Sequence, residues 1–185
     1  MGKSIYGFLF IAMSVLIISV SGNTEEAKRT KAVSIDPLIF GRIGFQYESL
    51  LSRHSSWMMR GSYGYIDHPI INAKYTVHGI GAAYRKYPYG NALNGVYFGL
   101  FGEARFISIV VDDYPNKGTV NRIVLGPGIE FGKQWIEDNG VLTDLGLSLH
   151  YYFGNTEAKV GDTTAKVNLL SGTGYGIRLA AGYAW

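Results

Sequence analysis

The sequence predicts an all-β protein: a closed antiparallel barrel of eight strands that cross a membrane, preceded by a signal peptide. Three observations support this fold class. Apolar residues alternate with small or polar residues along seven segments, which is the period of a strand with two unlike faces. The 185 residues include 25 glycines, roughly twice the average share. Beyond the N-terminal segment, no apolar run approaches the length of a membrane helix, about 18 residues.

The first segment, 1–22, is typical of a secretory signal peptide. Lys3 supplies the positive charge of the N-terminal region, an apolar run follows as far as Val20, and Gly22 is a small residue suited to the cleavage site. A retained membrane helix is the alternative, because the run is long enough to span a bilayer. Residues 23–31 are polar and charged, and we expect a flexible lead-in there.

Eight strands are expected in the barrel domain, 32–185. Clear alternation covers 41–49, 57–65, 76–85, 95–106, 122–132, 141–153 and 174–185. Closed bacterial barrels have an even number of strands, so we place the eighth over 31–37, where Val33 and Ile35 alternate with polar residues. It ends at Pro37, because proline cannot donate to a central ladder. A tight turn over 38–40 would follow.

The connections between these strands alternate in length. Turn residues mark short connections over 50–55, 87–94 and 134–140. The intervening connections are 67–74, 107–118 and 155–171, and the last two are longer and mostly polar. Short turns at one end and longer loops at the other are typical of outer-membrane barrels, so the pattern supports the strand count independently.

The composition of the two strand faces favours lipid outside and a filled lumen inside. The apolar face is almost free of charge, whereas the other is rich in glycine with isolated charges, which suits the narrow interior of eight strands. A soluble barrel, with ordinary core aromatics, is the alternative. Large aromatics lie on the apolar face, where they can mark the headgroup level: Tyr47, Trp57, Tyr63, Tyr65, Tyr84, Tyr151, Tyr183 and Trp185.

The inner face carries the candidate site, a lumen charge network. Its predicted members are Arg42, Glu48, Arg60, Arg85, Glu103, Arg105, Arg122, Glu130, Asp144, His150 and Arg178. One interpretation is a polar conduit or ligand site. The favoured interpretation is a set of ion pairs and hydrogen bonds that fills the lumen, because charges in a low-dielectric interior must be paired.

Catalytic and metal chemistry is weakly indicated. Ser148, His150 and Glu130 make a possible Ser/His/acid set, but side chains two apart on a strand are separated by roughly 6–7 Å. The acidic pair 112–113, with Asn116 nearby, could ligate Ca²⁺, although two adjacent carboxylates are more often part of a solvated turn. We therefore predict no catalytic residue, no cofactor and no metal.

Charge and cysteine content exclude further classes of function. The chain has 17 Lys and Arg against 14 Asp and Glu, which argues against a nucleic-acid partner, since that would require a concentrated basic face. It has no cysteine, and therefore no disulfide, thiolate metal site, cysteine nucleophile or lipoprotein anchor.

Several stretches resemble a known class of protein. VSIDPLIFGRIGFQYESLLSRHSSWMMRGSYGY, GIGAAYRKYPYGNALNGVYFG and the terminal aromatic are similar to the small OmpA/OmpX-type outer-membrane β-barrels of Gram-negative bacteria that lack a periplasmic domain. The resemblance implies export to the outer membrane. It also implies that Tyr183 and Trp185 form the signal that the barrel-assembly machinery reads.

The expected function follows from the fold and this resemblance. We expect a monomeric, non-enzymatic outer-membrane protein with a surface or structural role, in adhesion or envelope integrity. Its expected partners are outer-membrane lipid and the barrel-assembly machinery. Transport or binding of small hydrophobic ligands is the alternative, and a lipid-modifying enzyme is the less favoured third hypothesis.

Overall fold

The computed structural model describes residues 29–36, 42–68, 73–113, 116–154, 156–160, 163–166 and 172–185. The strands in them are β1 (Lys31–Asp36), β2 (Arg42–Ser52), β3 (Ser55–His68), β4 (Ala73–Asn91), β5 (Asn94–Asp113), β6 (Asn116–Ile136), β7 (Val141–Tyr152), β8 (Thr156–Val160), β9 (Thr163–Lys166) and β10 (Gly172–Ala184). No helix among these residues is long and apolar enough to cross a membrane. The predicted signal peptide and the predicted turn over 38–40 lie outside the described residues.

Eight of these strands close into one barrel in which every neighbouring pair is antiparallel. The ring runs β1–β2–β3–β4–β5–β6–β7–β10, and β10 returns to β1. The closing seam pairs Val33 with Tyr183 and Ile35 with Ala181. A closed ring satisfies the ladder N–H and C=O groups internally, which hydrocarbon requires because it contains no water. The predicted eight-stranded barrel is therefore confirmed, and β1 lies within the range expected for its least obvious strand.

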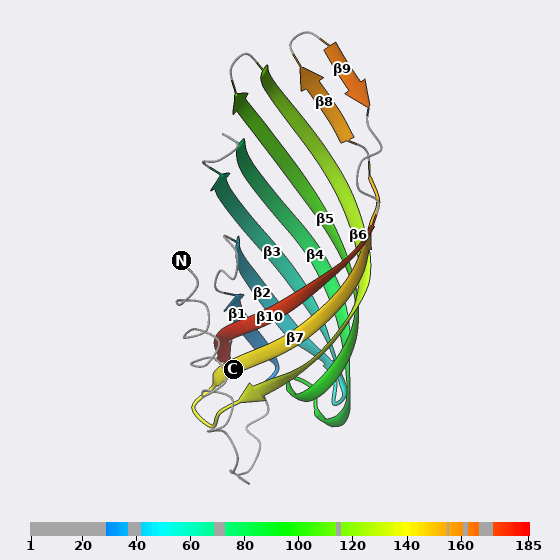
Figure 1. The fold of residues 1–185 in the computed structure, drawn as a ribbon. Coiled ribbons are helices and arrows are strands. Elements are labelled where there is room, and N and C mark those ends of the chain that lie inside the picture. Colours follow the sequence, from blue (N-terminus) through cyan, green and yellow to red (C-terminus); the bar gives the residue numbers. More distant parts are fainter. Residues whose placement is uncertain are drawn as a thin grey trace, which may run out of the picture.

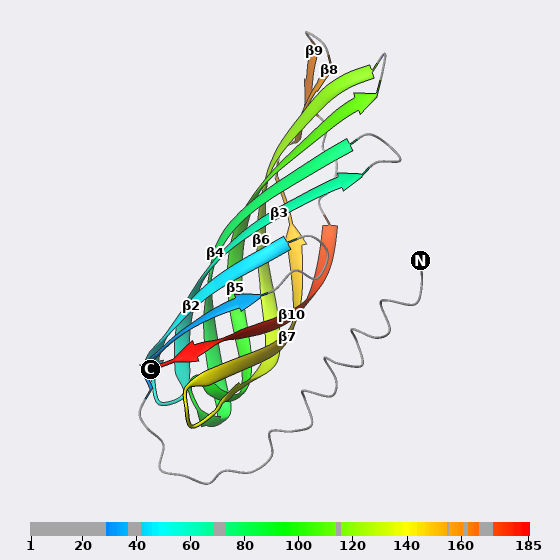
Figure 2. The same ribbon diagram turned by 90° about the vertical axis from the view of Figure 1, so that its left-hand side faces the viewer.

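The barrel wall is much taller on one side than on the other. β4, β5 and β6 have 19, 20 and 21 residues, whereas β1, β2 and β10 have 6, 11 and 13. Figure 1 shows β5 and β6 rising well beyond the ends of β7 and β10. Beside the upper part of β6, where β7 has ended, β8 pairs with 118–122 and β9 with β8 (Figure 2). We call this extension the projecting sheet: the loop-end parts of β3 to β6 together with β8 and β9.

Two predicted loops are corrected by this extension. The ladder between β5 and β6 continues to the pair Asp113–Asn116, so most of the predicted loop over 107–118 is paired strand. The predicted loop over 155–171 contains the β8–β9 hairpin. The lipid-facing alternation stops before these segments because strands that leave the membrane no longer need an apolar outer face, although their backbones still pair.

Tight connections lie at one end of the barrel, which we call the turn end; the opposite end is the loop end. They are residues 53–54, 92–93 and 137–140, each shorter than predicted because the paired strands continue further. Leu93 has a φ of 72°, in the left-handed region. The register shift between Lys86 and Tyr89 leaves Pro88 in an irregularity of β4, where no ladder N–H is needed.

The outer face of the barrel is apolar and the inner face is charged, which is the reverse of a soluble barrel. Large apolar side chains are exposed on the outer face of the ring strands, among them Val33, Phe45, Tyr63, Ile80, Leu100, Ile129, Leu147 and Ile177. The inner face buries charged residues such as Glu48, Arg85 and Glu130. This arrangement is the one that a membrane-spanning barrel requires, and it agrees with the face assignment made from the alternation.

On the outer face, aromatic side chains give way to polar ones toward the loop end, and this change marks where the strands leave the apolar band. One register row toward the loop end runs through Tyr65, Thr76, Ser108 and Asn121. The adjacent row toward the turn end, through Tyr63 and Phe106, is still aromatic. Rows of aromatic residues at the edge of an apolar band are typical of the membrane interface. The projecting sheet therefore lies beyond the membrane-crossing part of the barrel.

Candidate functional site

The lumen holds the eleven residues that the sequence singled out. They lie on the inner face of β2 to β7 and β10, and the structure gathers most of them into two groups. The lower cluster, nearer the turn end, consists of Glu48, Arg60, Arg85, Glu130, Asp144 and Arg178. The upper cluster, nearer the loop end, contains Arg42, Glu103, Arg105 and His150. Arg122 is buried on β6, one position along the inner face of that strand from Val124.

Arg85 is the centre of the lower cluster. Its side chain is fully buried and contacts three carboxylates: Nη1 lies 2.8 Å from Glu48 Oε2, Nε 2.8 Å from Glu130 Oε1, and Nη2 3.0 Å from Asp144 Oδ2. The guanidinium also lies 4.0 Å from the centre of the Tyr97 ring, a cation–π distance. Because the acids belong to β2, β6 and β7, Arg85 on β4 connects strands across the whole lumen.

Two further arginines complete the charge balance of the lower cluster. Arg178 lies 2.9 Å from Glu130 and 3.1 Å from Asp144. Arg60 Nη2 lies 2.8 Å from Glu130 Oε2, the oxygen that Arg178 also contacts. Three guanidinium groups thus face three carboxylates. Buried charges are tolerated when they are paired and hydrogen-bonded. Every charged group of this cluster is paired and hydrogen-bonded, and Arg60 Nε is its one buried nitrogen without a hydrogen-bond partner among the described residues.

Two tyrosines and one glutamine that contact the lower cluster were not singled out from the sequence. Tyr87 Oη lies 2.8 Å from Glu48 Oε1 and 3.0 Å from Gln134 Oε1, so its one proton can be donated to either acceptor, and Tyr97 Oη donates to Asp144 at 2.7 Å. The alternation had placed Tyr97 on the inner face, so its role could have been found. Tyr87 and Gln134 fell in segments predicted as turns, where the period assigns no face.

The β4–β5 hairpin covers the turn end of the lumen. It bends beneath the barrel (Figure 1), and Tyr87 and Tyr97 pack there with their ring centres 5.7 Å apart, both fully buried. The 53–54 turn holds the hairpin in place: Tyr87 N donates to His54 O at 2.9 Å, and Ala92 N donates to Arg53 O at 2.7 Å. Below the charge cluster, the lumen is therefore filled by packed side chains.

The upper cluster is smaller and partly open to the loop end. Arg105 donates two hydrogen bonds to Glu103, at 2.6 and 3.0 Å, and Arg42 donates a third at 3.2 Å. The Arg42 side chain is 37% exposed. Arg105 also lies over the Tyr152 ring, 4.7 Å from its centre, and Tyr152 packs against His150 at 4.4 Å. The cluster is a stacked layer of ion pairs and rings rather than an open channel.

The possible Ser/His/acid set does not assemble a nucleophile with its base. Glu130 is occupied by the three arginines of the lower cluster. Ser148 Oγ lies 3.5 Å from the carbonyl of Gly176, and His150 packs between Tyr152 and Phe101. Nucleophilic catalysis requires hydrogen-bond reach between the nucleophile and the base, and among the described side chains these contacts lead elsewhere.

The acidic pair at the loop end lies in a strand hairpin. Asp112 pairs with Lys117 and Asp113 with Asn116 in the ladder between β5 and β6. Within the part of the chain that the structure describes, no group of three or more acidic or histidine side chains is arranged to hold a metal ion. The geometry thus gives the calcium hypothesis no support.

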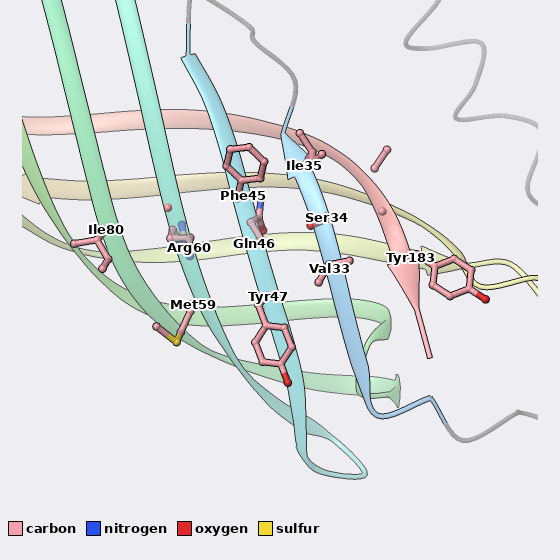
Figure 3. A pocket seen from close by; sticks show the side chains of 13 residues that line it. Val33, Ser34, Ile35, Phe45, Gln46, Tyr47, Met59, Arg60, Ile80 and Tyr183 are labelled. Atoms are coloured by element: carbon pink, nitrogen blue, oxygen red, sulfur yellow. The ribbon is translucent and has the colours of Figure 1, made fainter.

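An apolar groove, here called the outer groove, crosses the outer face of the barrel and has a volume of about 760 Å³. The outward side chains that line it are Val33, Ile35, Phe45, Tyr47, Met59, Ile80 and Tyr183 (Figure 3). They belong to β1, β2, β3, β4 and β10, so the groove lies over the closing seam and the short side of the barrel.

Comparison with known proteins supports the fold and leaves the function open. No family model matches the chain, and no curated protein matches it. Among solved structures, the barrel is similar to the crystal structure of a major outer membrane protein from Thermus thermophilus. The TM-score is 0.55 at 12% identity, and the match covers 85% of this chain and 99% of that one. At this identity, the likeness concerns the fold alone.

Proposed function

We propose that the protein is an integral barrel of a bacterial outer membrane, without enzymatic activity, that serves a surface or structural role in adhesion or envelope integrity. The observation that carries the proposal is the fully buried Arg85, in contact with three carboxylates from across the lumen. Eight strands leave little room for a channel, and here paired side chains occupy that room. The likeness to an outer membrane protein supports the proposed location.

The projecting sheet supports the surface part of the proposal. It extends beyond the polar row through Ser108 and Asn121 and is built from the longest strands of the barrel. Outer-membrane barrels direct their longer connections to the cell exterior. A paired sheet at that end would give the protein a rigid surface for contact with a partner outside the cell.

The proposed partners inside the envelope are outer-membrane lipid and the barrel-assembly machinery, with the barrel itself a monomer. Tyr183, on the outer face of β10, and Trp185, directly after that strand, are about half exposed, and β10 is the strand that closes the ring. That placement suits an assembly signal, because a factor that guides closure needs access to the seam.

Planar-bilayer recording tests the sealed lumen. The folded protein, verified by its heat-modifiable mobility in gels, is expected to give no large, steady single-channel currents. Such currents would contradict the proposal, because the lower cluster and the hairpin beneath it would then not fill the lumen.

Cysteine labelling in whole cells tests the orientation, since the natural chain has no cysteine. Thr119→Cys, in the projecting sheet, is expected to react with a membrane-impermeant maleimide in intact cells. Asn139→Cys, in a connection at the turn end, is the matched control and is expected to react only after the outer membrane is permeabilised. The reverse pattern would overturn the assignment of the projecting sheet to the surface.

One observation favours the alternative function, binding of small hydrophobic ligands. Above the upper cluster, the lumen-side face of the projecting sheet is apolar, with half-buried Tyr75, Val77, Ile107, Ile109 and Val120. A small apolar ligand could rest on this face. Saturable binding of an apolar fluorescent dye, lost in Ile109→Glu, would support this alternative; lipid mass spectra with and without the gene test the lipid-modifying enzyme.

A further inference from the structure

The floor of the outer groove is bare backbone. Gly182, Ser34, Gln46 and Arg60 form one register row across β10, β1, β2 and β3, and as inner-face positions they leave only main chain toward the outside. Neighbouring rows rise on both sides as ridges of large side chains (Figure 3). The depression is therefore a consequence of register, and it is fixed by the strand pairing.

One ridge has a gap that widens the groove. Its row runs from Ala181 through Ile35 and Phe45 to Gly61. A Cβ added at Gly61 would meet nothing within 4 Å, so that position is open space. The groove volume of about 760 Å³ lies within the range of small-molecule sites, about 300–1,000 Å³.

The groove lies in the apolar band of the outer face. Tyr47 packs edge-on against Trp57 at 5.6 Å, near the turn end. The polar row begins at Tyr65, four residues beyond Gly61 on the same strand. Between these levels the barrel faces hydrocarbon. Apart from two tyrosine hydroxyls, the side chains that point into the groove are apolar.

A phospholipid chain fits this chemistry better than a second copy of the protein does. Within a bilayer there is no hydrophobic driving force between proteins, and association depends on close packing and polar contacts, which this groove does not offer. At its turn end, exposed Lys31 continues the outer face of β1. Opposite it lie Ser49 on β2 and Trp185, which directly follows β10. An ammonium, a hydroxyl and an indole at this level suit a phosphate headgroup.

We propose that the outer groove is a lipid site: it holds one acyl chain of a phospholipid from the turn-end leaflet, with the headgroup phosphate beside Lys31. The inference rests on the proposed membrane location and adds a fixed position to what would otherwise be general solvation by lipid. It places the lipid over the closing seam, where β1, the shortest of the eight ring strands, pairs with β10.

Native mass spectrometry of the whole protein tests the site, with 1-palmitoyl-2-oleoyl phosphatidylglycerol added in mild detergent as the probe. Wild type is expected to retain one lipid per barrel. Gly61→Leu should retain severalfold less, because its side chain would fill the gap in the ridge. Gly102→Leu is the matched control: Gly102 is also an outer-face glycine with nothing within 4 Å of an added Cβ, but it does not line the groove. It should retain lipid as wild type does.

Each outcome has a defined meaning once heat-modifiable mobility has shown that all three proteins are folded. Equal retention by wild type and both variants would overturn the site, as would equal loss in both variants, which would indicate unspecific lipid. A dimer mass that disappears in Gly61→Leu would show that a second copy occupies the groove. Because conductance and surface labelling do not depend on this groove, failure here would leave the proposed function standing.

Discussion

Replacing Arg85 with methionine is expected to destabilise the barrel more than any other single change to the lumen charges. Arg85 is fully buried and contacts three carboxylates at 2.8 to 3.0 Å. The acids would not be affected equally. Glu130 would retain its ion pairs with Arg60 and Arg178, and Asp144 would retain its ion pair with Arg178. Glu48 would lose the ion pair with Arg85 that the structure shows for it.

The expected loss follows from that difference. Removing one partner of a buried ion pair costs about 3–5 kcal/mol, because the remaining charge stays buried. Glu48 is 3% exposed and would keep only neutral partners, the hydroxyls of Ser56 and Tyr87. We therefore expect Arg85→Met to lower the free energy of unfolding by about 3–5 kcal/mol, measured by urea titration in phospholipid vesicles.

Two companion variants make the test specific. Adding Glu48→Gln to Arg85→Met removes the stranded charge and should recover at least about 1 kcal/mol, within the usual range of coupling between contacting residues. Arg42→Met is the control: Arg42 is 37% exposed and Glu103 retains Arg105, so the loss should be about 1 kcal/mol or less. A loss below about 1 kcal/mol for Arg85→Met, or no recovery in the double variant, would refute the reasoning.

Three further predictions test the packing, the apolar band and the assembly signal. Gly132→Ala is expected to lower the free energy of unfolding by about 1–3 kcal/mol, because a Cβ there would overlap the Tyr97 ring and a strand carbonyl; an effect no larger than that of Gly102→Ala in the same urea titration would count against it. Leu147→Arg, on the exposed outer face, should cost about 2–4 kcal/mol, and Ser108→Arg, in the polar row, at most about 1 kcal/mol; equal losses would contradict the boundary. Trp185→Ala keeps the backbone bonds of the seam, yet it should reduce the folded protein recovered from outer-membrane fractions; wild-type recovery would reject the assembly signal.

The alternation was sufficient to predict the barrel because burial alternates along every membrane-crossing strand. Val33 and Ile35 gave the first strand although it has only six residues, since their neighbours are polar and small. The alternation no longer identified a strand where the outer face stops being more apolar than the inner face. In β5, Ile107 and Ile109 lie on the inner face while Ser108 lies on the outer face, so the apolar residues change sides, and a strand there was mistaken for a loop.

The charged residues of the lumen show what the alternation cannot predict about the site. Alternation could place Arg85 and Glu130 on one face, but it could not pair them. Pairing depends on contacts across the ring, and Arg85 on β4 reaches Asp144 on β7, 59 residues away. The contribution of Tyr87 to the site was missed for a different reason. The Tyr-Pro pair is typical of a turn, whereas β4 remains paired on both sides of a bulge at Pro88.

The lumen clusters and the tall side of the wall draw on strands of different length. Short strands, β1, β2 and β10, meet at the seam, and their inner faces bring Glu48 and Arg178 to the level of Arg85. Longer strands, β4 to β6, supply the remaining lumen partners and then continue past the membrane boundary as the projecting sheet. A substitution in the lower cluster should therefore reduce stability without altering the surface that the projecting sheet presents. If Arg85→Met also abolished labelling of Thr119→Cys in protein that is still folded, the projecting sheet would depend on the cluster, and this separation of roles would be wrong.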